Sequence, residues 1–211
     1  MRMKKCERGN KMKLVAIVGT NSDRSTNRKL LKFMAKHFAQ EAEIEILEIK
    51  DLPAFNEPEE KQAPQVVAEF NQKIAQAQGV IIATPEYDHT IPAPLSSTLE
   101  WIAYTSRPLI NKPVMIVGAS LGLLGTSRAQ AHLRQILDAP ELKARVMPGN
   151  EFLLGHSGQV LTDDGQLNNP DKVSELEDCF AEFLAFAELT NQLVKETDTK
   201  RKQAFAWELA D

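Results

Sequence analysis

The sequence predicts an α/β fold: a doubly wound parallel sheet of five strands with helices on both faces. Three observations support this prediction. Apolar runs of strand length alternate along the chain with longer segments in which apolar residues have helical spacing. No repeat or linker divides the 211 residues. Right-handed crossovers place such strands in one parallel sheet, and five strands favour the flavodoxin-like order.

The strands are expected from two kinds of pattern. Nearly continuous apolar runs predict strands buried on both faces at 13–19 (KLVAIVG), 79–83 (GVIIA) and 112–118 (KPVMIVG). Residues 43–49 (EIEILEI) alternate charged and apolar side chains, which predicts an edge strand with one face in water. A short fifth strand is expected around residues 145–153.

Five helical segments are expected, and the first and the last of them have apolar residues at the spacing of an amphipathic helix. The five segments are residues 27–40, about 65–77, about 95–105, about 126–137, and a last helix from about Asp171. Pro94 suits the first turn of the third helix, because its φ is already helical. A turn-rich loop over residues 155–170 precedes the last helix.

Composition narrows the class of protein. The net charge of −4 and a pI of about 5.7 argue against a nucleic-acid partner. No apolar run approaches the roughly 20 residues that a spanning helix needs, so no membrane association is expected. The two cysteines, Cys6 and Cys179, have no metal-ligand spacing. A reducing, cytoplasmic compartment is the expected location.

The ends of the chain are expected to lie outside the domain. Residues 1–12 are basic and polar without a signal-peptide core, and predict a disordered or non-native leader. The domain itself is expected over residues 13–195, and residues 196–211 as a C-terminal extension of the last helix. Phe205 and Trp207 in this extension either contact a neighbour or belong to a frayed helix.

The loop after the first strand, GTNSDRSTNRKL (19–30), predicts a phosphate site. Six of its residues carry hydroxyl or amide side chains at the start of a helix: Thr20, Asn21, Ser22, Ser25, Thr26 and Asn27. A helix N-terminus with such donors binds anions, and Arg24 and Arg28 add two charged donors. The alternative is that Ser25 or Thr26 only caps the helix. The loop contains neither GxxxxGK[ST] nor GxGxxG, which disfavours an NTPase or a dinucleotide fold.

The loops after the third and fourth strands predict a site for a flat ligand. In TPEYDHTIPAPLSSTLEW (84–101), Pro85 stiffens a loop that can hold backbone amides and the Tyr87 ring against a heteroaromatic. The alternative is a structural turn with Tyr87 packed in the core. In GASLGLLGTSRAQ (118–130), small residues allow a planar ligand close to the backbone, or form a flexible connection.

Together the three loops resemble one family, the NAD(P)H-dependent FMN reductases, which include quinone, azo-dye and chromate reductases. GTNSDRSTN, in the first loop, is similar to the family's GSxRxxSxN. TPEYDHTIPAPLSSTLEW, in the second loop (the one after the third strand), is similar to TPEYNxSxPxxLKNxxDW. SLGLLGTSRAQAHLRQIL (120–137) is similar to SxGxxGGxRxxxxLRxxL. Two positions depart from these patterns: Ser22 replaces the family's arginine, with Arg24 two residues further on, and Asp88 replaces the usual asparagine.

The resemblance implies a cofactor and the residues that hold it. It implies FMN, with NADPH or NADH as hydride donor, the phosphate at Ser22–Asn27 and the ring against residues 85–88. A carboxylate at Asp88 would then lie near the ring. No catalytic side chain and no metal are implied, and ping-pong kinetics are expected. The implied cofactor-binding residues are Thr20, Ser22, Arg24, Ser25, Thr26, Asn27, Pro85, Glu86, Tyr87, Asp88, Ser120, Leu121 and Gly122.

Partners are expected to be a small-molecule electron acceptor and further copies of the chain, as a homodimer or homotetramer. The helices near 95–105 and 126–137 carry more apolar residues than one sheet face is expected to cover, and the resemblance implies that such helices pair across a two-fold axis. Arg107 and Arg128 are candidates for a contact to a nicotinamide 2′-phosphate. Two alternatives remain open: an electron-carrier flavodoxin and a flavin-binding regulatory module.

Overall fold

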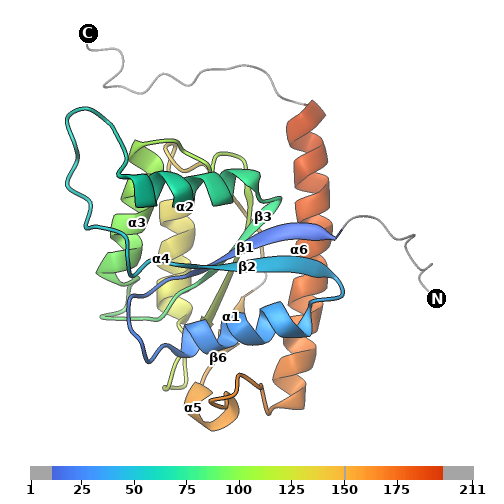
Figure 1. The fold of residues 1–211 in the computed structure, drawn as a ribbon. Helices are drawn as coiled ribbons and strands as arrows, with labels where there is room; N and C mark the ends of the chain where they lie inside the picture. Colours follow the sequence, from blue (N-terminus) through green and yellow to red (C-terminus); the bar gives the residue numbers. More distant parts are fainter. Residues whose placement is uncertain (1–10, 150, 197–211) are drawn as a thin grey trace.

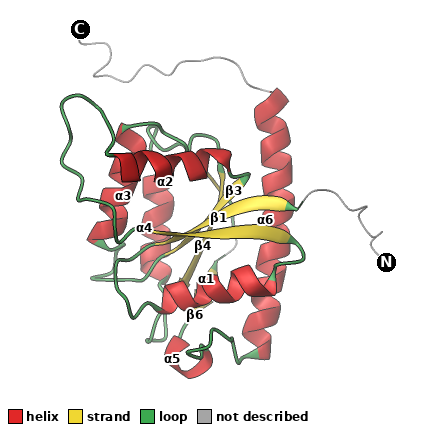
Figure 2. Cartoon of the chain, viewed as in Figure 1, coloured by secondary structure: helices red, strands yellow, loops and turns green. Residues whose placement is uncertain are grey.

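A computed structural model of the chain describes residues 11–149 and 151–196. Its sheet has the order β2-β1-β3-β4-β5, with β6 beside β4, and every strand pair is parallel (Figures 1 and 2). This order confirms the predicted flavodoxin-like sheet, with β2 at an edge. The strands are β1 (Met12–Val18), β2 (Ala42–Glu48), β3 (Gly79–Ala83), β4 (Pro113–Ala119), β5 (Arg145–Val146) and β6 (Phe152–Leu154).

The prediction of one short strand over 145–153 is wrong, because this edge is built from two pieces. β5 pairs with the beginning of β4, where Val114 faces Val146. β6 pairs with the end of β4, where Ala119 faces Leu154. Pro148 has no N–H to give to a ladder and Gly149 has φ +73, so the chain leaves the sheet after β5.

Helices cover both faces of the sheet, as predicted. The helices are α1 (Thr26–His37), α2 (Gln65–Gln76), α3 (Ala93–Tyr104), α4 (Ser127–Leu137), α5 (Ser157–Val160) and α6 (Pro170–Glu196). One core cluster joins α1 and α6 to the sheet, and the other joins α2, α3 and α4 to its opposite face. Along β1, Leu14 and Ala16 enter the first cluster whereas Val15 and Ile17 enter the second, as the alternation of a strand requires.

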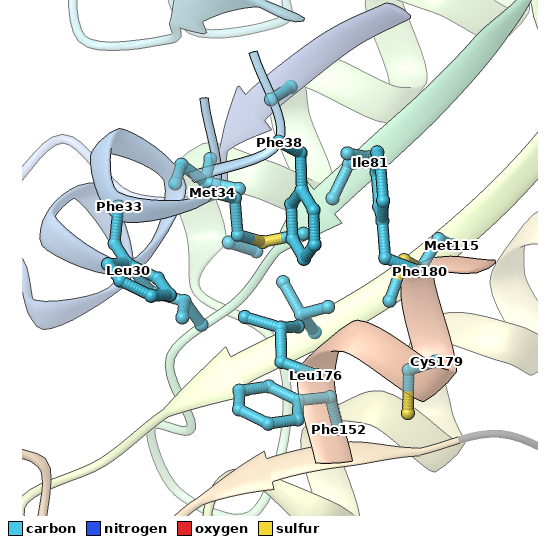
Figure 3. Close-up of a cluster of buried hydrophobic side chains, with 14 of the residues drawn as sticks. Leu30, Phe33, Met34, Phe38, Ile81, Met115, Phe152, Leu176, Cys179 and Phe180 are labelled. Carbon is cyan, nitrogen blue, oxygen red and sulfur yellow. The ribbon is translucent and has the colours of Figure 1, made fainter. Parts of the chain in front are cut away.

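The α1–α6 side of the core is rich in large side chains (Figure 3). The rings of Phe38 and Phe180 stack with centroids 3.9 Å apart, and Phe183 is fully buried on the next turn of α6. Complete burial of such a side chain contributes roughly 1.5–3 kcal/mol. This packing fixes α1, and therefore fixes the position of the loop that leads into it.

The helices α3 and α4 bury nearly all of the apolar side chains expected to be in surplus, and Ile136 alone among the seven is partly exposed. Six of their large apolar side chains are each at most 2% exposed within the single chain: Leu95, Leu99, Trp101, Ile102, Leu133 and Leu137. They pack against the sheet and the neighbouring helices, and Trp101 Nε1 donates to the carbonyl of Pro53 over 2.9 Å.

Strand β1 and helix α6 lie at the two ends of the part of the domain that the structure describes. Met12 is the first residue of β1, one residue before the predicted start, and α6 ends at Glu196. The rest of the predicted leader and of the C-terminal extension, residues 1–10 and 197–211, lies outside the described residues. Across the described part of the chain, no helix combines the length and apolar character needed to cross a membrane.

Candidate active site

A cavity of about 320 Å³ lies at the carboxyl ends of β1, β3 and β4. In doubly wound sheets this edge is where ligands bind. Its lining comes from the three loops singled out in the sequence: Thr20, Ser22, Arg24, Ser25, Thr26, Asn27, Pro85, Glu86, Tyr87, Ala119, Ser120, Leu121 and Gly122. Twelve of the thirteen predicted residues are in this set, Asp88 is not, and Ala119 is an addition.

The first loop leaves β1 through a position that only glycine can occupy. A Cβ at Gly19 would lie 2.6 Å from the carbonyl oxygen of Ala83, and the Gly19 amide donates to that same oxygen over 2.8 Å. The loop then turns, with the Ser22 amide donating to Thr20 Oγ1 over 3.2 Å. β1 and β3 therefore deliver their loops to the cavity in close contact.

Ser25 lies at the point where the loop becomes α1. Its Oγ accepts from the amide of Arg28 over 3.1 Å, which caps the helix as the alternative interpretation expected. The same residue lines the cavity, and its hydroxyl hydrogen is not used by this bond. Capping and ligand binding are therefore compatible at Ser25.

Asn27 and Thr26 connect the first loop to the end of β4. The Asn27 amide group exchanges two hydrogen bonds with the backbone of Ala119, both of 2.9 Å. Thr26 Oγ1 donates to the same carbonyl over 3.2 Å. Asn27 is 1% exposed, so its side chain positions the loops rather than reaching far into the cavity.

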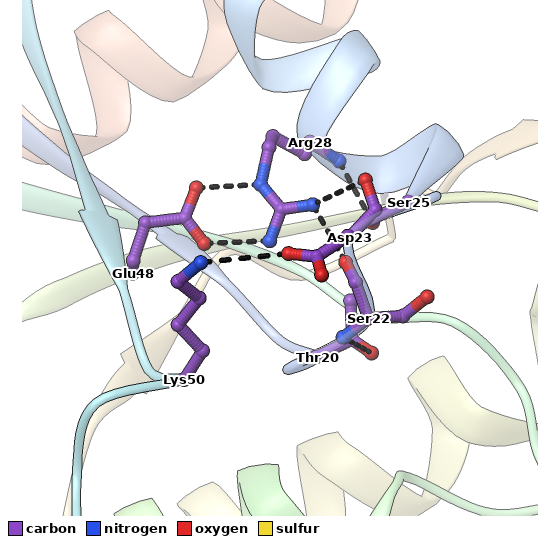
Figure 4. A network of polar contacts seen from close by, with 7 residues as sticks. All are labelled: Thr20, Ser22, Asp23, Ser25, Arg28, Glu48 and Lys50. Carbon is purple, nitrogen blue, oxygen red and sulfur yellow. Dashed lines mark hydrogen bonds and ion pairs between the residues drawn. The ribbon is translucent and has the colours of Figure 1, made fainter.

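Arg28 does not serve the cavity, and its assignment as an anion donor is wrong. Its guanidinium forms a bidentate pair with Glu48 of β2, with N–O distances of 2.6 and 2.7 Å (Figure 4). Nη1 also donates to the carbonyl of Ser22 over 2.6 Å. The hydrogen bond and charge of Glu48 raise the pKa of Arg28. The prediction failed because the partner is on a neighbouring strand, where loop composition gives no signal.

Arg24 remains as the cation at the cavity. It lines the cavity, is exposed, and has no hydrogen-bond or ion-pair partner within residues 11–149 and 151–196. Of the two arginines proposed in the sequence, only this one is placed to meet an anion.

The second loop forms a two-residue hairpin. Tyr87 and Thr90 exchange backbone hydrogen bonds of 3.0 and 2.9 Å, around Asp88 and His89, whose φ angles of +49 and +63 match a type I′ turn. Tyr87 is 49% exposed, so the alternative in which it packs in the core is wrong. Asp88 is exposed at the tip of the hairpin and is not among the residues that line the cavity.

Glu86 has a role that the sequence did not reveal. Its carboxylate accepts from the amides of Arg128 and Ala129 at the start of α4, over 3.0 and 3.3 Å, and pairs with Arg128 Nη1 at 3.2 Å. The residue before α4, Thr126, gives no side-chain cap. Glu86 therefore caps α4 from another loop, and a hydrogen bond between the Thr90 hydroxyl and His132 Nδ1 ties the hairpin to the same helix.

The two arginines proposed for a nucleotide 2′-phosphate are both engaged. Arg128 pairs with Glu86 at the rim of the cavity. Arg107 follows the end of α3, where its Nε donates to the carbonyl of Ala103 over 3.1 Å, and it is not among the lining residues.

The third loop is held by the segment that follows β6. Ser120 donates its amide to Leu154 over 2.9 Å, and His156 donates its amide to Gly122 over 2.8 Å. A Cβ at Gly155 would lie 2.3 Å from the carbonyl oxygen of Leu123, so the two segments are in close contact.

Gly122, in the same loop, is not crowded by the protein, because a Cβ there would meet no protein atom within 4 Å. The protein's own packing therefore does not require glycine at Gly122, which lines the cavity.

The fold is flavodoxin-like, and the three loops at the carboxyl ends of β1, β3 and β4 line one cavity. A model of the family described as NADPH-dependent FMN reductase matches residues 12–159, and the chain belongs to this family. Membership confirms the predicted enzyme class, an FMN-dependent oxidoreductase that uses NAD(P)H. No group of residues that could hold a metal ion occurs in the described part of the chain.

Similar proteins cover most of the chain. The NADH:(hydroxy)cinnamate reductase subunit CrdA of Vibrio ruber is 57% identical over 198 residues, which cover 93% of this chain and 98% of the relative. NADH-dependent flavin reductase subunit 2 of Lactobacillus johnsonii is 45% identical, with coverage of 84% and 98%. The solved structure of FerB, an NAD(P)H:(acceptor) oxidoreductase from Paracoccus denitrificans, has a TM-score of 0.72 at 23% identity, covering 86% and 98% of the two chains, and so supports the fold.

Proposed function

We propose that the cavity at the carboxyl ends of β1, β3 and β4 holds FMN, with its phosphate at residues 20–27 and its ring between residues 85–87 and 120–122. One observation carries this proposal: residues from three loops, distant in sequence, line a single cavity. Asp88 is left out of the proposed set, because it is not among the residues that line the cavity.

The donors of the first loop fit a phosphate. The N-terminus of α1 has a partial positive charge and amides without partners inside the helix, which favour an anion there. Ser22, Ser25 and Arg24, which carry two hydroxyls and a guanidinium, are among the residues that line the cavity. Arg28 supports this arrangement indirectly, since it holds the carbonyl of Ser22.

The other two loops fit a planar ring. Pro85, Tyr87 and Leu121 supply apolar surface, and Gly122 leaves room for close approach. Glu86 keeps its carboxylate on the helix start of α4, where the helix dipole and Arg128 offset its charge.

The reaction needs little chemistry from the protein. When bound, FMN supplies the redox chemistry, taking a hydride from NAD(P)H and passing electrons to an acceptor. The chain's residues bind and orient, and no side chain is proposed as a general acid or base. An open cavity that admits donor and acceptor in turn favours ping-pong kinetics with a small flavin- or quinone-like acceptor.

A second candidate for the acceptor is a partner protein. CrdA of Vibrio ruber and the Lactobacillus johnsonii flavin reductase are both named as subunits. If this chain works in the same way, its electrons pass to another subunit rather than to a free small molecule.

Steady-state kinetics test the proposal. We expect the purified protein to bind FMN and to oxidise NADH or NADPH with a quinone, giving parallel lines in double-reciprocal plots. Tyr87→Ala should weaken FMN binding and leave the fold intact, since Tyr87 is half exposed at a hairpin. Binding without turnover would instead favour an electron carrier, a regulatory module or a subunit that needs its partner. Full FMN affinity in Tyr87→Ala would remove this loop from the site.

A further inference from the structure

A second hollow lies on the far side of the molecule from the proposed FMN site. It has a volume of about 440 Å³ and separates β5 from the last turns of α6. Apolar side chains dominate its lining, among them Val146, Pro148, Phe186, Leu189 and Leu193. Leu189 is 67% exposed, which is unusual for a leucine beside other apolar residues. We refer to this hollow as the α6 groove.

The groove also has a cation whose charge is not matched. Arg145 lines it, and no carboxylate within residues 11–149 and 151–196 lies within ion-pair distance of its guanidinium. Its hydrogen bond to Asn111 Oδ1 is long, at 3.5 Å, and its Nε is buried without a partner among the described residues. An occupant that combines apolar side chains with a carboxylate would therefore complement this groove.

The sequence contains such a segment close by. The structure describes α6 as far as Glu196, and residues 197–211 follow it with the apolar-rich stretch AFAWELA (204–210). Phe205, Trp207 and Leu209 alternate there with smaller or charged residues, and Glu208 supplies a carboxylate.

The length of the chain allows this segment to return to the groove. Residues 197–204 span at most about 26–29 Å when fully extended. Leu189 lies only about 10 Å before Glu196 along the axis of α6. Tethering also gives the segment an effective concentration in the millimolar range, which favours it over a second copy of the chain.

We propose that residues 204–210 dock into the α6 groove of their own chain, with Phe205, Trp207 and Leu209 against Leu189 and Glu208 near Arg145. The site is distinct from the proposed FMN cavity. β5 is level with the beginning of β4, whereas the cavity lies at the end of β4. The Glu196 end of α6 likewise lies far from α5 in Figure 1. Docking therefore stabilises the molecule without touching the redox site.

Trp207 provides a direct probe. The chain has two tryptophans, and Trp101 is 2% exposed, so subtracting the emission of a Trp207→Phe variant isolates Trp207. Docking predicts a blue-shifted Trp207 emission that acrylamide quenches weakly. Leu189→Asp should shift this emission to the red and increase its quenching to that of a free peptide of residues 197–211. Val66→Asp, at another partly exposed apolar residue on α2, is the matched control and should leave Trp207 protected.

Three outcomes would overturn the proposal. One is a parent protein in which Trp207 is already quenched like the free peptide. Another is protection that survives Leu189→Asp. The third is protection that is lost on dilution, which would place the segment in the groove of a second copy. NAD(P)H oxidation should be equal in the parent and both variants, so a failure of the proposed enzyme function is recognised separately.

Discussion

Ser25 carries the sharpest test of the phosphate site, because the two interpretations of this residue predict opposite results. Asp is also a good N-cap, so Ser25→Asp should preserve or slightly improve the start of α1. A carboxylate about 4 Å from a phosphate at an effective dielectric constant of 20 costs about 4 kcal/mol per charge pair. We therefore expect a folded protein that purifies without FMN and regains activity only at high FMN concentration.

The control is Ser174→Asp, which makes the same change at an exposed residue in the first turns of α6, outside the cavity. It should leave FMN affinity, measured by fluorescence titration, unchanged. A Ser25→Asp protein that remains yellow and fully active would exclude phosphate binding at this turn.

Cys179 predicts a loss of stability at alkaline pH. Burial, with smaller contributions from Glu175, Glu182 and Asp178, raises the pKa of this thiol from 9.0 to about 11. The folded state therefore favours the neutral thiol. Below pH 9 the thiol is protonated in both the folded and the unfolded protein, so its contribution to the free energy of unfolding is fully present. That contribution is lost as the pH rises toward 11. Denaturant unfolding should give a steeper decline over this interval for the parent than for Cys179→Ala. Equal slopes would contradict the assignment.

At the scale of elements, α4 depends on a cap supplied by another loop. Glu86→Ala removes the acceptor for the amides of Arg128 and Ala129, and Thr126 offers no side-chain replacement. Loss of an N-cap costs roughly 0.5–2 kcal/mol, and we expect a loss of that size in the free energy of unfolding. Glu86→Gln keeps one oxygen acceptor and should lose less. If both variants have the same free energy of unfolding as the parent, the contact between Glu86 and the start of α4 does not stabilise the fold.

The elements show which parts of the fold a sequence can predict. The strands β1, β3 and β4 and the edge strand β2 could be predicted from apolar patterning alone. The sequence of each strand shows by itself whether one or both of its faces are buried. Pro148 and Gly149 were visible in the sequence, yet the break between β5 and β6 was missed because the apolar residues on either side were treated as one run. The partners of Arg28 and Glu86 could not be predicted, since both depend on which strand or helix lies opposite.

At the scale of the whole molecule, we still predict an oligomer. The surface that supports this prediction is now the loop between β4 and α4, rather than the helices α3 and α4. Three exposed leucines project from the loop between β4 and α4: Leu121, Leu123 and Leu124 are 71%, 74% and 47% exposed. Hydrogen bonds to the segment after β6 fix this loop, so its apolar side chains are presented on an ordered backbone.

We expect light scattering at micromolar concentration to give at least a dimer. Leu123→Ser should weaken the assembly, because it removes an exposed apolar side chain from this loop. Leu123 does not line the cavity, so the substitution leaves the proposed FMN site unchanged. Val66→Ser is the control at a surface position on α2. A strictly monomeric mass for the parent protein would contradict this prediction.

The break between β5 and β6, at the outer edge of the sheet beside β4, also affects the tendency of the protein to aggregate. An uninterrupted outer strand offers a row of free backbone groups to which a strand of another molecule can add. Here that outer position is divided into two residues of β5 and three of β6, with a proline after the first piece. The opposite border, β2, alternates apolar residues with Glu43 and Glu45, and Glu45 pairs with Lys73, so charged side chains lie along this edge and disfavour the addition of another strand. Both borders of the sheet are thus poor templates for fibre growth.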